Sequence, residues 1–278
     1  MAAMQVAALC AVCLLPSSLA LPLPQSRGGW SESQWEQAQN YLKRFYSADS
    51  KTKNANNLEA KLKEMQIFFR LPITGTLNSH ILEIMNKPRC GMPDVAGTGT
   101  GRPKWNSKVI TYRLASYTAD LPYVTVNQLI EKAFKMWSKE VPLSFRRVKW
   151  GIADIKMSFV RREHGDLYPF DGPGNTLAHA YYPGPGLGGD VHFDEDERWT
   201  SGRTSGINLL YVATHELGHS LGLSHSSDPN SLMYPTYKDE NLDDFKLSRD
   251  DIKSIQELYG NINYFKFGGF HIVSIEIR

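Results

Sequence analysis

The sequence predicts a mixed α/β (α+β) domain, built on a twisted sheet with a central helix beneath it and a C-terminal helix, and preceded by a small three-helix domain. Apolar residues recur every three or four positions in three segments between residues 30 and 85, which is the spacing of amphipathic helices. From residue 105 onward, strand-like segments alternate with helical ones. The length of 278 residues suits one small and one medium domain.

The small domain is expected to form around three apolar stripes. These stripes are Trp35, Ala38, Leu42 and Phe45 in the first helix, Leu58, Leu62, Met65 and Phe68 in the second, and Leu77, Ile81, Leu82 and Met85 in the third. Ser31 with Gln34, or Ser33 with Glu36, can form a capping box before the first helix. Pro72 prevents the second helix from continuing. We assign these stripes to a hydrophobic core and predict no chemistry for them.

The larger domain begins near Trp105. Strands are expected at Val109–Leu114, Leu143–Val148 and Ala153–Val160. An amphipathic helix is predicted from Thr125 to residue 140, with Thr125 and Gln128 as its capping box. Ser248 is expected to cap a last helix that Gly260 ends.

Residues 1–20 have the character of a secretory signal peptide. They contain no acidic residue, an apolar run from Val6 to Leu15, and the small-residue cleavage pattern that ends at Ala20. The apolar run is too short to span a bilayer, and no later segment is long enough either. We therefore expect a secreted protein without a transmembrane segment. The net charge of +2 and the lack of a basic block argue against nucleic acid as a partner.

The chain has three cysteines, of which Cys10 and Cys13 lie in the signal peptide. Cys90 is then the one thiol of the mature chain. A single thiol in an oxidising compartment cannot form an intramolecular disulfide, so Cys90 needs another explanation.

The strongest motif is the stretch HELGHSLGLSH, which reads H-E-x-x-H-x-x-G-x-x-H with His215, Glu216, His219, Gly222 and His225 at the specified positions. Residues four apart share one face of a helix, so His215 and His219 should direct their rings toward one point. Gly222 can take a left-handed conformation that ends the helix, which lets His225 approach the same point. The motif therefore predicts three imidazole ligands for one metal ion.

Zinc is the metal that suits this arrangement. Three protein ligands leave a fourth position open to water, as in catalytic sites, and lower the pKa of that water toward about 7. Glu216 lies beside His215, off the ligand face but within reach of such a water, and is expected to act as the general base. The alternative is a helix that carries histidines by chance, and the coincidence of five positions argues against it.

Together with this motif, the segment PRCGMPD at residues 88–94 resembles the cysteine switch of the matrix metalloproteinases, a metzincin family. The resemblance implies that Cys90 fills the open zinc position and keeps the enzyme latent. A thiolate is a strong zinc ligand, which agrees with that role. The resemblance further implies an ion pair between Arg89 and Asp94 that holds the segment across the cleft. The alternative is a buried or stray thiol.

The resemblance also divides the chain. It implies a signal peptide at 1–20, a helical propeptide with the cysteine switch at 21–96, an activation linker at 97–103, a metzincin zinc metalloprotease catalytic domain at 104–260 and a tail at 261–278. The glycine-rich linker is a natural place for cleavage, but it lacks the aromatic or aliphatic residues that the family often has at its new N-terminus. The cleavage position is therefore not predicted.

A second group of ligands follows the third strand. His164, Asp166, His179 and His192 offer three imidazoles and a carboxylate, and four protein ligands close a tetrahedral zinc site, which makes it structural. Scattered, solvated histidines are the alternative from composition alone. The match to the family's pattern favours the structural zinc.

Glycine-rich turns around these histidines supply the oxygen ligands that calcium takes in sets of six to eight. By resemblance, one calcium would use Asp171, Gly172, Gly174, Thr176, Asp194 and Glu197, a second Asp154, Gly186, Gly188 and Asp190, and a third Asp120, Glu195 and Glu197. The alternative is that these glycines merely form turns. We therefore expect two or three calcium ions.

Three further features bear on substrates. Leu177–Tyr182 resembles the family's edge strand, which pairs with an extended substrate. Tyr211 sits where the family lines its specificity pocket, and its bulk predicts a preference for Leu-like residues just after the cut. Met233 matches the family's Met-turn, beneath the three histidines, although a plain core methionine would look the same.

The resemblance ends near residue 260. The 18 residues after Gly260 are too few for a hemopexin-like propeller, so we expect the architecture of the family's short member. The tail alternates apolar residues from His271 to Ile277 and would form an extra edge strand or a disordered end. Its role is not predicted.

The resemblance implies a secreted, monomeric zinc endopeptidase made as a zymogen. It would hydrolyse extended segments of extracellular-matrix proteins, collagen among them, and of cell-surface proteins. Activating proteases and tissue inhibitors of metalloproteinases would be its partners. The alternatives are a non-catalytic binding module stabilised by zinc and calcium, and a precursor that never activates because its linker has changed.

Overall fold

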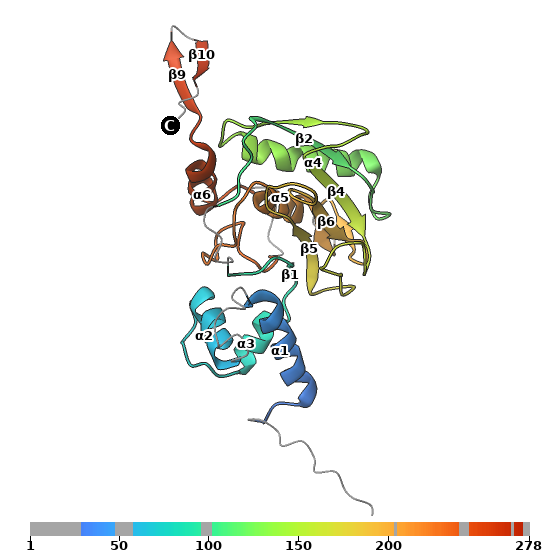
Figure 1. Cartoon of the computed structure of the whole chain (residues 1–278), viewed down its shortest axis with the longest axis vertical. Coiled ribbons are helices and arrows are strands. Elements are labelled where there is room, and N and C mark those ends of the chain that lie inside the picture. Colours follow the sequence, from blue (N-terminus) through green and yellow to red (C-terminus); the bar gives the residue numbers. More distant parts are fainter. Residues whose placement is uncertain are drawn as a thin grey trace, which may run out of the picture.

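The computed structural model describes residues 29–47, 58–95, 102–202, 205–238, 245–267 and 270–274, with the backbone alone from 263 onward. The expected signal peptide and most of the activation linker lie outside the described residues. Figure 1 shows a small helical domain beside a larger mixed domain, with the segment that contains Cys90 between them. Within the described ranges, no helix is both long and apolar enough to cross a membrane.

The small domain consists of the three helices that the apolar stripes predict. They are α1 (Glu32–Phe45), α2 (Leu58–Phe68) and α3 (Ser79–Met85). Ser31 caps α1, and Gln34 completes the capping box, so the first of the two expected boxes forms. Asn78 caps α3. Tyr41, Leu42, Met65 and Ile81 are buried in one core between the helices.

A six-stranded mixed sheet forms the centre of the larger domain, in the order β1-β5-β6-β4-β2-β3. Its strands are β1 (Arg89–Cys90), β2 (Val109–Leu114), β3 (Ser144–Arg147), β4 (Ile155–Val160), β5 (Thr176–Ala180) and β6 (Val191–Asp194). All neighbours are parallel except β5 and β6. A short parallel pair, β7 (Trp199–Thr200) and β8 (Ile207–Asn208), lies beside it.

Strand β1 comes from the segment before the linker and covers the edge of β5. Arg89 is opposite Thr176 and Cys90 is opposite Ala178, in parallel register. Gly91 N also donates to the carbonyl oxygen of Ala178 at 2.7 Å. The strand expected at 177–182 is therefore present, but in this form of the chain its edge is already paired.

Two long helices pack under the sheet. Helix α4 (Tyr123–Ser138) begins two residues before the expected start, and its N-cap is Pro122. The capping box predicted from Thr125 and Gln128 is wrong, because α4 has no side-chain cap. The fixed φ of Pro122 suits a helix start without one. Trp137 of this helix donates through Nε1 to the carbonyl oxygen of Thr214 at 2.9 Å, which joins α4 to the central helix.

The central helix, α5 (Leu209–Ser220), has every residue buried. The last helix, α6 (Arg249–Tyr259), starts at the predicted cap Ser248 and ends at Gly260, whose φ is +80°. Beyond it, β9 (Asn263–Phe267) and β10 (Phe270–Ser274) pair antiparallel with each other. The tail is thus a hairpin of its own, which projects past α6 (Figure 1).

Candidate active site

Helix α5 holds the first two predicted ligands one turn apart. Its N-cap Asn208 accepts a hydrogen bond from Tyr211 N at 3.2 Å, which fixes the start of the helix. The Nε2 atoms of His215 and His219 lie 3.2 Å apart. Each ring is oriented by its Nδ1, which lies 2.7 Å from a carbonyl oxygen, that of Leu232 for His215 and that of Leu223 for His219. These contacts leave both Nε2 lone pairs free for a metal ion.

The third ligand depends on Gly222. Its φ is +104°, and a Cβ at this position would lie 2.1 Å from the carbonyl oxygen of Pro103. Only glycine therefore allows the chain to leave α5 here. The turn brings the His225 ring within 4.6 Å of the His219 ring, centroid to centroid. In the described part of the chain, Nε2 of His225 is buried and has no hydrogen-bond partner.

Cys90 completes the cluster. Its sulfur and one nitrogen from each of His215, His219 and His225 all lie within 4.8 Å of one another, and all four residues are buried. The pairing of β1 with β5 holds the thiol there. Three imidazole nitrogens and a thiol sulfur are ligands that zinc takes in proteins, so these four residues fit that metal.

Burial sets the protonation of this cluster. Burial, and after it the neighbouring His225, lowers the pKa of His215 to about 3. The pKa of His219 is lowered well below its usual value by the same causes. Neutral imidazole is the form that binds metal. Burial also raises the pKa of the Cys90 thiol.

Glu216 lies beside the metal ligands on α5 and is completely buried. Burial raises the pKa of Glu216 to about 8. A carboxyl group with a pKa near neutrality can both accept and release a proton at physiological pH, as a general base must. The position agrees with the role that the motif predicts.

The cysteine-switch segment carries a buried ion pair between Arg89 and Asp94, as the resemblance implies. Two tyrosines enclose the pair, Tyr41 in α1 and Tyr46 directly after it. Arg89 donates to the hydroxyl of Tyr41, and Tyr46 donates to Asp94 Oδ2. Burial alone would raise the pKa of Asp94, but Arg89 and His225 bring it down to about 2. The small domain thus holds the switch segment through charges that are excluded from water.

Asp94 also reaches the catalytic cluster, which the sequence did not predict. Its Oδ1 lies 2.9 Å from Nδ1 of His225, and both side chains are completely buried. Further unpredicted contacts come from Asp251, which accepts from Met233 N at 3.1 Å and from Leu232 N at 2.9 Å. The only available signal for Asp251 was its place as the third residue after the cap Ser248.

Met233 lies under α5 as expected. It is 2% exposed. A Cβ added to Gly218 would lie 2.3 Å from the Met233 sulfur, so the helix and the turn are in close contact. Gly218 is the residue before His219, so the turn contacts α5 next to a predicted metal ligand.

The second predicted cluster also forms. One ligand atom from each of His164, Asp166, His179 and His192 lies within 4.8 Å of the others. Strands β5 and β6 bring His179 and His192 directly opposite each other. Asp166 Oδ2 is 2.9 Å from His164 and His179 and 2.8 Å from His192. Burial lowers the pKa of His192 to about 4 and also lowers that of His179, so both rings are neutral.

The first predicted calcium set lies around the turn before β5. Asp171 Oδ1 accepts from Thr176 N at 3.2 Å, and Glu197 Oε1 accepts from Gly174 N at 2.6 Å. Among the described residues, Asp194 Oδ2 is buried without a hydrogen-bond partner. Burial raises the pKa of Glu197 to about 7 and also raises those of Asp171 and Asp194. Gly172 belongs to the same turn, with a φ of +91°.

The carboxylates of the second set have protein partners. Asp154 Oδ2 accepts from Thr111 N at 2.7 Å and from its hydroxyl at 2.6 Å. Asp190 Oδ2 lies 3.0 Å from Lys156 Nζ. Gly186 and Gly188 lie in the loop between β5 and β6.

Two carboxylates of the third set each accept a hydrogen bond from a backbone N–H group. Asp120 Oδ2 accepts from Trp199 N at 2.8 Å, and Glu195 Oε1 accepts from Ala119 N at 2.9 Å. Glu195 Oε2 is buried and has no hydrogen-bond partner among the described residues. One carboxylate oxygen of this set is therefore available to a cation.

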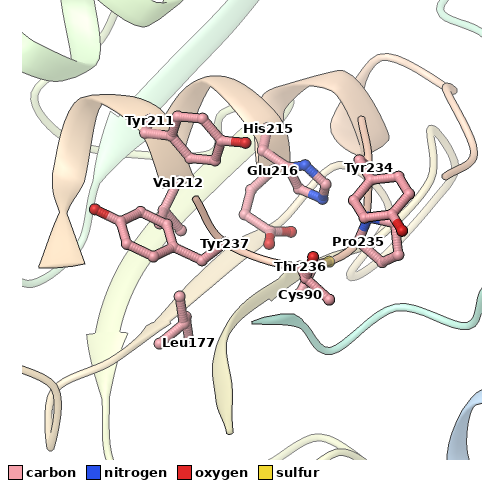
Figure 2. A pocket seen from close by; sticks show the side chains of 10 residues that line it. All are labelled: Cys90, Leu177, Tyr211, Val212, His215, Glu216, Tyr234, Pro235, Thr236 and Tyr237. Carbon is pink, nitrogen blue, oxygen red and sulfur yellow. The ribbon is translucent and has the colours of Figure 1, made fainter. Parts of the chain in front are cut away.

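A narrow pocket opens beside the cluster, between α5 and residues 234–237 (Figure 2). Tyr211 and Tyr237 lie toward one end of it, and Glu216 and Cys90 toward the other. The Tyr211 ring packs against Tyr237 and Phe245, with centroids 5.3 Å and 5.4 Å away. The space left free in the pocket is about 10 Å³, about the room of one water molecule. Tyr211 thus lies in the wall of this pocket, and its effect on specificity stays a prediction.

The comparisons with known proteins agree with this geometry. Residues 104–260 match the model of the Matrixin family. The chain belongs to the matrixin family. It is therefore the zymogen of a zinc matrix metalloproteinase, and the alternative of a non-catalytic binding module is not favoured. Residues 31–85, which contain all three helices of the small domain, match a family model described as "Putative peptidoglycan binding domain".

Matrilysins from two species align with more than nine tenths of this chain. Human matrilysin is 69% identical over 259 residues, which cover 92% of this chain and 97% of that protein. Mouse matrilysin is 60% identical over 262 residues, covering 94% and 99%. Mouse stromelysin-1 is 52% identical over 234 residues, which cover 81% of this chain but 49% of stromelysin-1. The expected likeness to the family's short member, matrilysin, is confirmed.

Proposed function

We propose that this matrixin is secreted as a latent precursor and, once its propeptide is removed, cleaves extended segments of extracellular-matrix and cell-surface proteins. The single observation that carries the proposal is the convergence of three buried imidazoles and the Cys90 sulfur, with all four ligand atoms within 4.8 Å of one another. Glu216, buried beside them, supports hydrolysis rather than mere metal storage.

We infer that His215, His219 and His225 hold the catalytic zinc. Their neutral rings and the free Nε2 of His225 support this assignment. A zinc ion in such a site supplies an activated water and a positive charge for the oxyanion of the scissile carbonyl. Glu216 takes the proton of the attacking water and then delivers it to the leaving amine. The chemistry needs no covalent enzyme intermediate.

Latency has two sources in this proposal. The Cys90 sulfur occupies the position that water needs. In addition, β1 pairs with β5, so an extended substrate cannot add to the same edge. Removal of residues up to the activation linker at 97–103 would free both the metal position and the strand edge.

The remaining site assignments are structural. We infer a second, structural zinc at His164, Asp166, His179 and His192, because four protein ligands leave no open position. Calcium at Asp171, Asp194 and Glu197 is supported by their raised pKa values and by the free Asp194 oxygen. The second calcium set is a weaker proposal, since Asp154 and Asp190 are already engaged by Thr111 and Lys156. The third set is supported by the free Oε2 of Glu195.

The pocket supports a preference for Leu-like residues just after the cut. Its free space is small because Tyr211 is packed between Tyr237 and Phe245. Any side chain has to open this space further, and a leucine requires less displacement of the buried tyrosine than a large aromatic side chain does. Tissue inhibitors of metalloproteinases and activating proteases are the partners that we propose, and we propose that the protein acts as a monomer.

The deciding experiment is cleavage of a fluorogenic peptide by the purified precursor before and after treatment with a thiol-reactive mercurial, with Glu216→Ala as the control. We expect cleavage only after treatment, and none by Glu216→Ala. If the wild-type protein remains inactive after Cys90 is blocked and the propeptide is gone, the enzyme proposal fails. That outcome would favour the non-catalytic binding module, because the propeptide no longer covers the site.

A further inference from the structure

One of the three histidines takes its orienting partner from the propeptide. Nδ1 of His225 lies 2.9 Å from Oδ1 of Asp94, although 131 residues separate the two in the sequence. Both side chains are completely buried, so water does not compete for the contact. Asp94 belongs to the segment that activation removes, whereas His225 belongs to the catalytic domain.

The other two histidines differ in this respect. His215 and His219 are oriented by the backbone carbonyls of Leu232 and Leu223, which remain in place after the propeptide leaves. His225 is therefore the ligand whose second contact depends on the state of the precursor. This difference in the Nδ1 partner of each histidine does not involve Cys90.

We propose that Asp94 is a positioning residue for His225, so that the propeptide strengthens zinc binding through a carboxylate as well as through the Cys90 thiolate. The inference rests on the proposed function, because it assumes that His225 holds the catalytic zinc. A carboxylate that accepts the Nδ1 proton fixes the tautomer with a free Nε2, orients the ring and raises its basicity. Once the propeptide has gone, Nδ1 of His225 keeps no partner from residues 88–94.

Asp94 is well placed to transmit the state of the small domain to the metal. Its Oδ2 accepts from Tyr46, while Arg89 contacts both of its oxygens. Removal of the propeptide would therefore take the carboxylate away from His225. The competing explanation is that Asp94 serves only as the counter-ion of Arg89 and that its approach to His225 has no consequence.

The test measures zinc affinity by competition with a chelator in the full-length precursor. Asp94→Asn keeps the size of the side chain but removes its charge. We expect it to weaken one of two zinc sites by about 10–100-fold, as loss of such a partner usually does. The cluster at His164 and its three partners should keep its affinity and serves as an internal reference. Tyr46→Phe is the matched control, because it removes a contact to Oδ2 and leaves Oδ1 on His225.

A second measurement can also be made on the wild-type protein alone, before and after propeptide removal. In the zinc-loaded wild-type precursor, proton NMR should show a strongly downfield signal from the Nδ1 proton of His225. We expect this signal to persist in Tyr46→Phe and to disappear or move upfield in Asp94→Asn and after propeptide removal. An indifferent contact would not produce this pattern.

The outcomes separate the two proposals. A folded Asp94→Asn precursor with wild-type zinc affinity at both sites overturns the inference, and so does a wild-type signal that survives propeptide removal unchanged. If Asp94→Asn does not fold, the wild-type NMR comparison decides. A wild-type precursor that binds zinc only at the His164 cluster would instead remove the proposed function itself.

Discussion

The Nε2 atoms of His215 and His219 lie 3.2 Å apart, across one turn of α5. Each ring is held by a hydrogen bond from its Nδ1 to a backbone carbonyl, at 2.7 Å in both cases. The helix thus presents two preoriented lone pairs at a separation that one metal ion can bridge. Helix geometry and two carbonyl contacts are sufficient to produce this pair.

Replacement of Glu216 by alanine should abolish catalysis without emptying the site. Glu216 is not among the clustered ligands, so zinc content should remain at the wild-type level. Loss of a general base lowers the rate by about 10²–10⁴-fold. The measurement is kcat/KM on a fluorogenic peptide after mercurial treatment, together with zinc analysis of the same sample. Full activity in this variant would remove Glu216 from the mechanism.

Replacement of Cys90 by serine should lower latency. Serine is a poor zinc ligand compared with a thiolate, so water would reach the metal even while β1 stays paired with β5. We expect the untreated variant precursor to cleave short peptides that do not need the paired edge of β5, while the untreated wild type does not. The rate before mercurial treatment is the readout. A variant as inactive as the wild type would show that strand pairing alone maintains latency.

Tyr211→Leu should enlarge the pocket and relax specificity. The buried ring packs against Tyr237 and Phe245, and its removal opens the closed end. One methylene group in a hydrophobic pocket changes selectivity by about 10–200-fold. We expect the kcat/KM ratio for leucine over phenylalanine after the cut to fall by about tenfold. The same change at Tyr123, which is 66% exposed, should leave the ratio unaltered.

Gly222→Ala should destabilise the protein. At a φ of +104°, with a Cβ 2.1 Å from the Pro103 carbonyl oxygen, alanine is both strained and blocked. The strain alone costs about 1–3 kcal/mol. Gly202→Ala is the matched control, because an added Cβ there meets nothing within 4 Å. Thermal unfolding of both variants is the measurement, and an equal Tm for the two would show that the turn tolerates a side chain.

Calcium should stabilise the protein more at pH 8 than at pH 5. Burial raises the pKa of Glu197 from 4.5 to about 7, so the metal-free folded chain holds a proton there that the unfolded chain has lost. The metal-free stability from this group is complete below pH 4.5 and declines as pH rises toward about 7. Above about pH 7, bound calcium would offset the cost of burying the ionised carboxylate of Glu197.

The readout for this calcium effect is the difference in Tm between calcium and chelator at each pH. Glu197→Gln should largely remove the dependence on pH. Glu83→Gln changes a side chain that is 72% exposed and should have no effect. An equal calcium effect at pH 5 and pH 8 in the wild type would argue against Glu197 as a ligand.

Local sequence patterns predicted the parts of the site that depend on local geometry. The i,i+4 spacing of His215 and His219 and the need for glycine at 222 are properties of a helix and its end, so the motif was sufficient. The predicted start of α4 was wrong because a local pattern was not sufficient there. Thr125 and Gln128 satisfied a local pattern, but the helix starts two residues earlier at Pro122.

Contacts between distant segments were beyond those patterns. The approach of Asp94 to His225 spans 131 residues and depends on how the small domain sits against the catalytic domain. Resemblance suggested that Arg89 and Asp94 pair, but not that the carboxylate would also face a metal ligand. The hairpin after α6 was likewise unpredicted, because alternation from His271 did not reveal that β9 would be its partner.

The most direct test of the central claim is X-ray absorption at the zinc edge of the full-length precursor and of its activated form. We predict a sulfur neighbour at about 2.3 Å in the precursor, from Cys90 on the zinc held by His215, His219 and His225. This sulfur should vanish in Cys90→Ser and after propeptide removal, leaving nitrogen and oxygen ligands. A zinc-loaded wild-type precursor with nitrogen and oxygen neighbours alone would contradict the claim.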